Sequence, residues 1–439
     1  MKTILYRKLL IAVIAIGSWL SGNSQQYPDS LFHYLEIAVK NNPTVLQRFN
    51  EYQAALQKVP QVGGLPDPEL STGVFLSPME LVNGNQIADI RIMQMFPWFG
   101  VLKNAKDEMS LMANAKFEQL RDAKLQVLYD VERTWYELYK VQKEISISEK
   151  NIEILKLIER LALVKFKSSS SGNSLSSSPG SSSELSDLAD IYRIQIESGD
   201  MINNIAYLEN QQNSIAARFN TFLNRPVISP VYTYENISRD SLEFSLPAVS
   251  DSMLLNNPML GMLDFEQQSL EARKKLVKRM GYPMMGFGLN YSLISKTQSS
   301  MGEPSMNGRD MIMPMVVFTI PVYRKKYNAM QNEAELLKTA ASENYKATAN
   351  ALLNDYYQAV LLYQDAQRRI TLYENQFQLA SKSLDLILKS FSASSAGLTD
   401  VLRVRQQTLD FELKQVEAVA DFNIAAAWLK RLMAFSQIQ

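Results

Sequence analysis

The chain has 439 residues, of which 46% are apolar, so it can bury a large core. Lys plus Arg and Asp plus Glu number 45 each, which leaves no overall basic field to attract nucleic acid and no acidic excess. The absence of cysteine excludes a disulfide framework, a thiolate metal site and a lipid-modified N-terminal cysteine. Composition therefore argues against nucleic-acid binding and leaves the fold open.

The N-terminus has the pattern of a secretory signal peptide. Basic residues precede an apolar run over 9–20, and small residues follow over 21–24. The run is shorter than the roughly 20 residues that a membrane-spanning helix needs, so we expect cleavage near Ser24 and export of the mature chain. No later window is long and apolar enough for a helical span, and membrane insertion would therefore use strands. The sequence predicts a signal peptide over 1–24.

The mature sequence contains an internal duplication. The motif Asn-Asn-Pro occurs at 41–43 and again at 256–258, and the same order of sequence patterns follows each copy. A period of this length is too long for a solenoid unit and indicates duplication of a whole structural unit. The predicted units are a first repeat over 25–224, a linker or equatorial segment over 225–247, and a second repeat over 248–439.

Each repeat is predicted to contain a helix, two strands, a long helix and a shorter return helix, in that order. Asn followed by Pro is a favoured start for a helix, because Asn caps the free N–H groups and Pro needs none of its own. In the first repeat the expected elements are helix 29–58, strands 69–78 and 86–96, and helices 102–166 and 185–224. In the second they are helix 248–280, strands 283–295 and 310–321, and helices 326–391 and 398–435.

The strand segments alternate as membrane-spanning strands do. Ile90 and Ile92 alternate with Asp89 and Arg91, which separates an apolar face from a charged one. About ten residues that are apolar outside and polar inside are typical of outer-membrane barrels, although a soluble sandwich hairpin has the same pattern. In the third segment we interpret one set of alternating residues as facing lipid, namely Met285, Phe287, Leu289, Tyr291 and Leu293.

The two long helices are free of proline, and each spans about 100 Å. Their apolar residues recur at three- and four-residue spacing, which is the seam of coiled-coil packing. An opening helix and a return helix placed end to end match one long helix in length. The predicted fold is therefore mainly α with a small β part, an antiparallel coiled-coil rod with four strands per chain. Four strands cannot close a barrel, so closure requires several chains.

Three segments, 64–70, 94–100 and 397–402, resemble the TolC-like outer membrane efflux family. The resemblance covers nearly the whole mature chain. It implies a homotrimer with a shared 12-stranded barrel in the lipid of the bacterial outer membrane and an α-helical barrel in the periplasm. It further implies a passive exit duct of a tripartite efflux or type I secretion system. An inner-membrane pump of RND or ABC type would deliver the substrate through a periplasmic adaptor protein. No enzymatic activity and no cofactor are implied.

The resemblance also implies that the helix turns furthest from the membrane form the closed end of the duct. Asp400 matches an acidic family position, Asp187 occupies the equivalent place in the first repeat, and Arg403 stands where the family often repeats the acid. We expect these three residues at the pore or gate, where carboxylate rings favour cations. Alternatively, Asp400 serves only the first turn of a helix. Expected adaptor contacts at the tip are Leu185, Gly397, Leu398 and Thr399.

Three further patterns leave alternatives open. Phe96, Trp98, Phe99 and Tyr323 lie where strand gives way to helix, which suits either an interfacial aromatic belt or ordinary packing. Seven methionines within 284–315 offer soft ligands for monovalent copper or silver, or simply adaptable apolar side chains. The Ser-rich stretch 168–183 is either a flexible loop or part of the adaptor contact.

Two other classes of protein compete with the channel. Long helices alone would also suit a coiled-coil structural or adhesive protein of the cell surface or periplasm. An exported hydrolase is disfavoured, because the single histidine, His33, lies in a helix and no nucleophile or phosphate-loop motif is present. We therefore expect no catalytic, cofactor or metal site.

Overall fold

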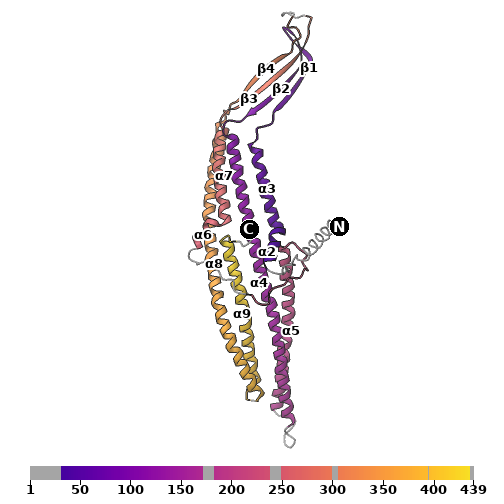
Figure 1. Ribbon diagram of the computed structural model, residues 1–439, viewed down its shortest axis with the longest axis vertical. Coiled ribbons are helices and arrows are strands. Elements are labelled where there is room, and N and C mark those ends of the chain that lie inside the picture. Colours follow the sequence, from indigo (N-terminus) through magenta and orange to yellow (C-terminus); the bar gives the residue numbers. More distant parts are fainter. Residues whose placement is uncertain (1–30, 172–181, 238–248, 299–304, 394, 436–439) are drawn as a thin grey trace, which may run out of the picture.

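The computed structural model describes residues 31–171, 182–237, 249–298, 305–393 and 395–435. The predicted signal peptide lies outside these residues, as do parts of the Ser-rich stretch and of the linker. A long helical rod carries a small sheet at one end (Figure 1). The predicted fold class, mainly helical with a small antiparallel sheet, is confirmed.

The first repeat contains four helices and two strands in its described part. Both of its strands are longer than the predicted ranges 69–78 and 86–96. Only two residues separate the end of the first strand from the start of the second. The bounds are α2 Leu31–Asn41, α3 Pro43–Gly63, β1 Glu69–Leu81, β2 Gly84–Phe96, α4 Val101–Ser171 and α5 Ser182–Phe222.

The second repeat has the same order of elements. Its bounds are α6 Val249–Asn256, α7 Pro258–Met280, β3 Met284–Ser295, β4 Met311–Thr319, α8 Arg324–Ser392 and α9 Leu398–Leu432. The two long helices, α4 and α8, span 71 and 69 residues without interruption.

The opening helix of each repeat is divided, whereas the sequence predicted single helices over 29–58 and 248–280. Asn42 and Asn257 adopt extended backbone conformations, because a residue before proline is disfavoured in the α region. The side-chain oxygen of each asparagine caps the next helix. The amide of Asn42 donates to the carbonyl of Phe222 at 2.9 Å, and that of Asn257 to Leu432 at 3.1 Å. Equivalent bonds therefore tie each division to the end of the return helix.

The rod consists of two long helices with shorter helices along them. α3 and α5 both pack against α4, while α7 and α9 both pack against α8 (Figure 1). α4 also contacts α7 and α9, which joins the two repeats. Each long helix is therefore matched along its length by two shorter helices.

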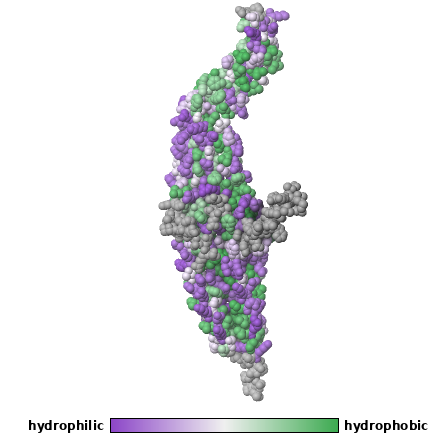
Figure 2. Space-filling view, in the orientation of Figure 1, coloured by the Kyte–Doolittle hydropathy of each residue, from purple (hydrophilic) through white to green (hydrophobic). Residues whose placement is uncertain are grey.

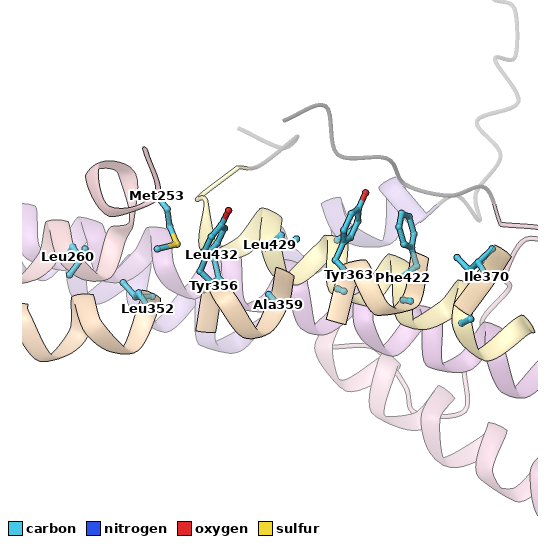
Figure 3. Packing of buried hydrophobic residues seen from close by; sticks show 14 residues of the cluster. Met253, Leu260, Leu352, Tyr356, Ala359, Tyr363, Ile370, Phe422, Leu429 and Leu432 are labelled. Atoms are coloured by element: carbon cyan, nitrogen blue, oxygen red, sulfur yellow. The ribbon is translucent and has the colours of Figure 1, made fainter. Parts of the chain in front are cut away.

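Buried apolar clusters follow one another along the rod. One surrounds Trp135 of α4 and Phe219 of α5, and another lies between α8 and α9. In the second cluster Tyr363 and Phe422 lie with ring centroids 4.5 Å apart (Figure 3). A third cluster, at the far end, brings Leu155 and Val401 together. The core of the rod is thus a series of apolar clusters between packed helices.

The four strands form one antiparallel sheet in the order β1-β2-β3-β4. The central pair, β2 and β3, joins the two repeats, with Ile92 opposite Leu289. β1 and β4 are the edge strands, and each has one side without a partner strand within the described chain. The sheet therefore ends in two unpaired edges.

Candidate functional site

One face of the sheet is apolar and exposed. Pairing places Leu70, Ile92, Leu289 and Pro314 in one row across the four strands, so their side chains point to the same side. Of the residues predicted to face lipid, Phe287 and Leu289 are 53% and 45% exposed. Figure 2 shows the apolar colouring gathered over the strands. Other exposed apolar members of this outer face are Val74, Ile90, Ile312, Val316 and Phe318.

The remaining predicted lipid-facing residues, Met285, Tyr291 and Leu293, lie on the same outer face and are partly buried. Because every second residue of β3 points the same way, the alternation in the sequence places these side chains beside Phe287 and Leu289. All five therefore share one face of the sheet.

The opposite, inner face carries polar, partly enclosed side chains on β2 and β3 and methionines on β4. Arg91, Asn290 and Met313 form one row, and Asp89, Ser292 and Met311 form the next. Asn290 and Ser292 are buried although polar. On the central strands the sheet thus exposes apolar side chains and encloses polar ones, which is the reverse of a water-soluble sheet.

Of the methionines within 284–315, Met306 lies in a turn and Met301 lies outside the described residues, while those on β3 and β4 divide between the two faces of the sheet. Met311, Met313 and Met315 lie on the inner face, where Met93 of β2 lies over Gly288. In the described part of the chain, no group of three or more His, Cys, Asp or Glu residues could hold a metal ion.

Aromatic side chains gather where the strands give way to helices. Trp98 stacks on Tyr282, with ring centroids 5.5 Å apart and planes at 13°. Phe99 packs edge-on against Trp98, and Tyr323 is 81% exposed. Phe96 contacts Phe287 on the sheet. The four predicted interface residues therefore lie at the junction of strands and helices. Phe96, Trp98 and Phe99 make aromatic contacts, and Phe99 and Tyr323 are largely exposed.

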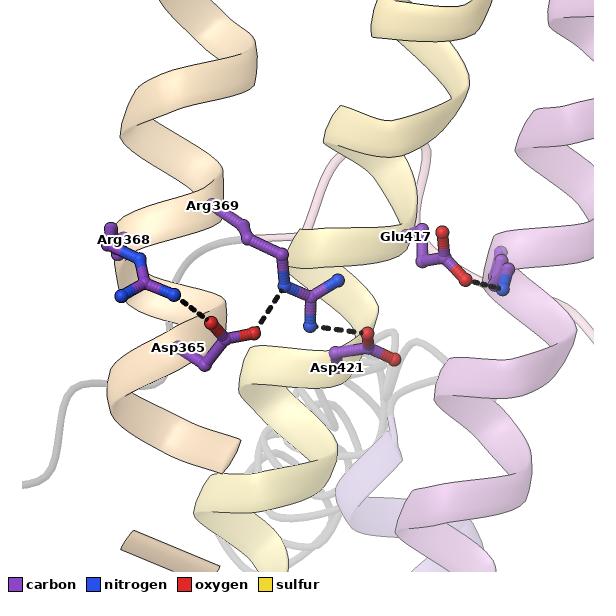
Figure 4. A network of polar contacts seen from close by, with 6 residues as sticks. Asp365, Arg368, Arg369, Glu417 and Asp421 are labelled. Carbon is purple, nitrogen blue, oxygen red and sulfur yellow. Dashed lines mark hydrogen bonds and ion pairs between the residues drawn. The ribbon is translucent and has the colours of Figure 1, made fainter. Parts of the chain in front are cut away.

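Ion pairs tie the helices together in the middle of the rod. Arg369 of α8 bonds to Asp365 on its own helix and reaches Asp421 of α9 at 2.8 Å (Figure 4). Lys140 of α4 reaches Glu417 of α9 at 2.7 Å. Both contacts join α9 to a long helix, so α9 is held on two sides.

A partly buried carboxyl lies beside this network. Burial raises the pKa of Glu144 on α4, although nearby Lys140 acts in the opposite direction. The position is on the rod, far from the strands in sequence. Burial between the helices therefore favours the protonated form of this carboxyl.

The turn at the start of α9 contains most of the predicted gate and docking residues. Asp400 pairs with Arg403 of the same helix at 2.9 Å, and Arg193 of α5 donates to the Thr399 hydroxyl at 2.9 Å. Gly397 is exposed, whereas Leu398 is only 2% exposed within the third cluster. The structure therefore brings Thr399 and Asp400 to the surface and places Leu398 in the core.

The matching residues of the first repeat are described less fully. Leu185 and Asp187 belong to α5, but their side chains lie outside the described part of the structure. Whether they face Asp400 stays a prediction.

Arg405 is a residue that the sequence interpretation missed. It is 1% exposed on α9 and bonds to Glu197 of α5 at 2.5 Å. Its Nε and one terminal nitrogen have no hydrogen-bond partner, and burial lowers the pKa of its guanidinium. The apolar seam offered the signal, since Arg405 follows Leu398 and Val401 at helical spacing, where charge is costly. A buried cation therefore joins the return helices of the two repeats.

None of the helices in the described ranges combines the length and apolar character that crossing a membrane requires.

Comparisons with known proteins found a sequence match to the second repeat and structural matches to nearly the whole chain. Residues 249–434 match the family described as outer membrane efflux protein, and no curated protein matches the sequence. The channel CusC superposes with a TM-score of 0.74 at 14% identity, over 92% of this chain and 92% of that one. VceC of Vibrio cholerae gives 0.71 at 12% identity, over 92% and 96%. MtrE of Neisseria gonorrhoeae gives 0.68 at 12%, over 92% and 89%.

At such low identity the solved structures establish the fold, while the family match rests on the sequence of the second repeat. Both findings agree with the resemblance found in the three sequence segments. The second repeat therefore matches the outer membrane efflux protein family in sequence, and the whole chain has the fold of the outer-membrane channels to which it was compared.

Proposed function

We propose that the protein is the outer-membrane exit duct of an export system, and that it works as a homotrimer. The observation that carries this proposal is the reversed sheet, in which Phe287 and Leu289 face outward and Asn290 is enclosed. Exposed apolar strands are stable where the surroundings are lipid. Members of the family function as outer-membrane channels in tripartite efflux systems, which supports this location.

The two open sheet edges support assembly. A lipid-exposed strand edge leaves backbone N–H and C=O groups without partners at high cost, so β4 of one subunit needs β1 of the next. A head-to-tail contact of this kind closes into a ring when the rotation between subunits fits. Three copies give the twelve strands of the family's shared barrel.

The rod supports the same ring. α8 lies on the opposite side of the rod from α3 and α5 (Figure 1). Both sides expose large apolar residues that a neighbouring subunit would cover. On α8 these are Leu336, Tyr357, Leu361, Leu379 and Leu386, and on α3 and α5 they are Leu46, Phe49, Tyr192, Ile196 and Tyr207.

The far end of the rod is the expected gate and the expected contact with a periplasmic adaptor. Asp400 lies at the turn between α8 and α9, and Asp187 lies near the start of α5. Carboxylates arranged in rings would favour cations in a narrow pore. The duct itself is passive, so the inner-membrane pump determines the substrate.

Location and assembly are tested by fractionating cells and running the unheated outer-membrane fraction on a gel. We expect the protein in that fraction as a trimer that dissociates on heating. A monomer in the soluble periplasmic fraction would overturn the proposal. It would favour the alternative, a coiled-coil structural or adhesive protein.

Gating is tested by single-channel recording in a planar bilayer. The double substitution Asp187→Ala/Asp400→Ala should raise conductance or reduce the preference for cations, because both carboxylates are removed from the narrow end. The matched control is Asp200→Ala/Asp385→Ala, two exposed positions along the same hairpins. If the tip substitutions change neither conductance nor cation preference, neither residue lies at the narrow part of the pore.

A further inference from the structure

Basic side chains crowd the junction between the sheet and the second-repeat helices. Lys278 and Arg279 end α7, and Arg324, Lys325 and Lys326 begin α8. All five are exposed. Figure 2 shows hydrophilic colouring over the upper ends of α7 and α8, directly next to the apolar strands. We call these five residues the junction cations.

The junction cations have no acidic partners in the described structure. None of them forms an ion pair, whereas basic residues a few turns further from the sheet do. Lys274 reaches Glu335 at 2.7 Å, and Lys338 reaches Glu271 at 2.8 Å. Lys274 and Lys338 are therefore neutralised by acidic partners, whereas the five junction cations next to the sheet are not.

The helix dipole accounts for only part of this charge. Lys278 and Arg279 lie in the last turn of α7, where cations are favoured. Arg324 and its two neighbours lie in the first turn of α8, where acidic residues are favoured and none is present. Three adjacent cations at this end repel one another and the helix dipole, so an external anion would relieve an unfavourable arrangement.

A pocket of about 310 Å³ lies between the two groups of cations. Lys278 and Arg324 line it, together with Tyr282, Tyr327 and the apolar Ile320. The cations and tyrosine hydroxyls suit a phosphate, while the apolar wall suits the glycerol and upper acyl region of a lipid. The stacked Trp98 and Tyr282 lie at the same level, and such rings mark the headgroup region of a membrane.

We propose that the pocket and the junction cations bind the phosphate headgroup of an anionic phospholipid in the leaflet that faces the periplasm. The depth of the site in the membrane rests on the proposed function, but recognition of the headgroup does not. On the first-repeat side Asp67 and Glu69 lie at the start of β1 and the first turn of α4 holds Lys103 alone, so the second-repeat side is the more basic and takes the lipid. A trimer would carry one such site per subunit.

Binding is measured on the purified, delipidated full-length protein in neutral detergent, by native mass spectrometry. Short-chain phosphatidylglycerol and phosphatidylcholine are the probes, and neither requires the protein to lie in a bilayer. We expect phosphatidylglycerol to bind about 10-fold or more tightly than phosphatidylcholine, with the preference falling as salt is added. Equal binding of the two lipids would overturn the proposal.

Two variants locate the site. Lys278→Gln/Arg324→Gln/Lys325→Gln should weaken phosphatidylglycerol binding about 10-fold. The control Lys274→Gln/Lys338→Gln/Lys346→Gln removes the same charge from ion-paired positions on the same helices and should bind as wild type does. An equal loss in the control would show a general charge effect and overturn the site.

Two further measurements distinguish lipid from free phosphate, and this inference from the proposed function. If inorganic phosphate competes as strongly as the lipid, the site takes free phosphate and the lipid assignment is wrong. Heat-modifiable trimers and conductance are recorded on the same samples. A channel that conducts but shows no lipid preference would overturn this inference alone. A wild-type protein that forms no trimer or conducts no current would contradict the proposed function instead.

Discussion

The rod and the sheet follow opposite rules for apolar residues. In the rod, Trp135 and Phe422 are buried between helices, and most charged residues lie on the outside, with Arg405 a buried exception. In the sheet, Leu289 and Val316 are exposed, and Asn290 is enclosed. The same transfer of apolar surface out of water would stabilise both parts, and for the sheet the proposed receiving medium is lipid.

With the proposed membrane location, the comparison predicts that the two parts depend on different surroundings. The rod has its own core and can be stabilised in water by packing within one chain. A four-stranded sheet with both edges open and an apolar outside has no such core. Its stability is expected to come from membrane and neighbouring subunits, so substitutions in the two regions should respond to different conditions.

The largest expected effect tests the rod. Trp135→Ala should cost about 3–5 kcal/mol of unfolding free energy, because it empties the site of a fully buried ring. It also removes the bond from the indole N–H to the Tyr232 carbonyl, at 3.2 Å. Denaturant unfolding followed by circular dichroism measures the loss. The control, Phe99→Ala, removes an exposed ring and should cost under about 1 kcal/mol. Similar losses of unfolding free energy for Trp135→Ala and Phe99→Ala would contradict the burial of Trp135 in a packed core.

The next effect tests the sheet. Leu289→Arg should cost about 2–4 kcal/mol in lipid vesicles, because the outer face then carries a charge into hydrocarbon. The same substitution at the exposed Leu65, which precedes β1, should cost about 0–1 kcal/mol near the interface. Unfolding by denaturant in vesicles measures both. Equal losses of unfolding free energy for Leu289→Arg and Leu65→Arg would contradict a lipid-facing sheet.

A smaller effect tests whether the two repeats are equivalent within the rod. Asn42→Ala and Asn257→Ala should each cost about 1–2 kcal/mol, because each removes a helix cap and leaves a carbonyl of the return helix unpaired. Thermal unfolding of the two variants gives the comparison. Asn50→Ala, at an exposed position of α3, is the control. A marked cost at only one of the two caps would show that the repeats differ in this role.

The smallest effect is a pH dependence confined to the rod. Because the pKa of Glu144 is raised in the folded chain, the native state keeps this proton to higher pH than the unfolded chain does. Its contribution is fully present below the ordinary Glu pKa of about 4.3 and is lost as pH rises through the raised value. Glu144→Gln should therefore become progressively more stable than wild type above that pH. Unfolding measured across pH tests this, with the exposed Glu149→Gln as control.

The sequence predicted most elements of the fold because their signals are local. Alternation marked the strands, and the absence of proline marked the long helices. The division before Pro43 was only half recognised: the cap was predicted, but the helix was drawn through it. The division of the opening helix also depends on the hydrogen bond from Asn42 to Phe222, which joins distant parts of the chain. No local pattern carries such a contact.

The candidate site was predictable to a different degree in its two parts. The lipid-facing set on β3 follows from alternation alone, so all five residues share one face. The union of β2 with β3 across the repeats, and the enclosure of Leu398 at the tip, depend on tertiary packing. The pairing of Arg405 with Glu197 likewise required the return helices to be placed together.

The unbroken helices have a mechanical consequence. α4 and α8 continue past the points where their partner helices are divided at Asn42 and Asn257. A twist applied at the far turn cannot be absorbed at those divisions without bending a continuous helix beside them. The rod should therefore transmit torque along its full length, and loosening the tip would require its helices to slide or rewind there instead of folding at the middle.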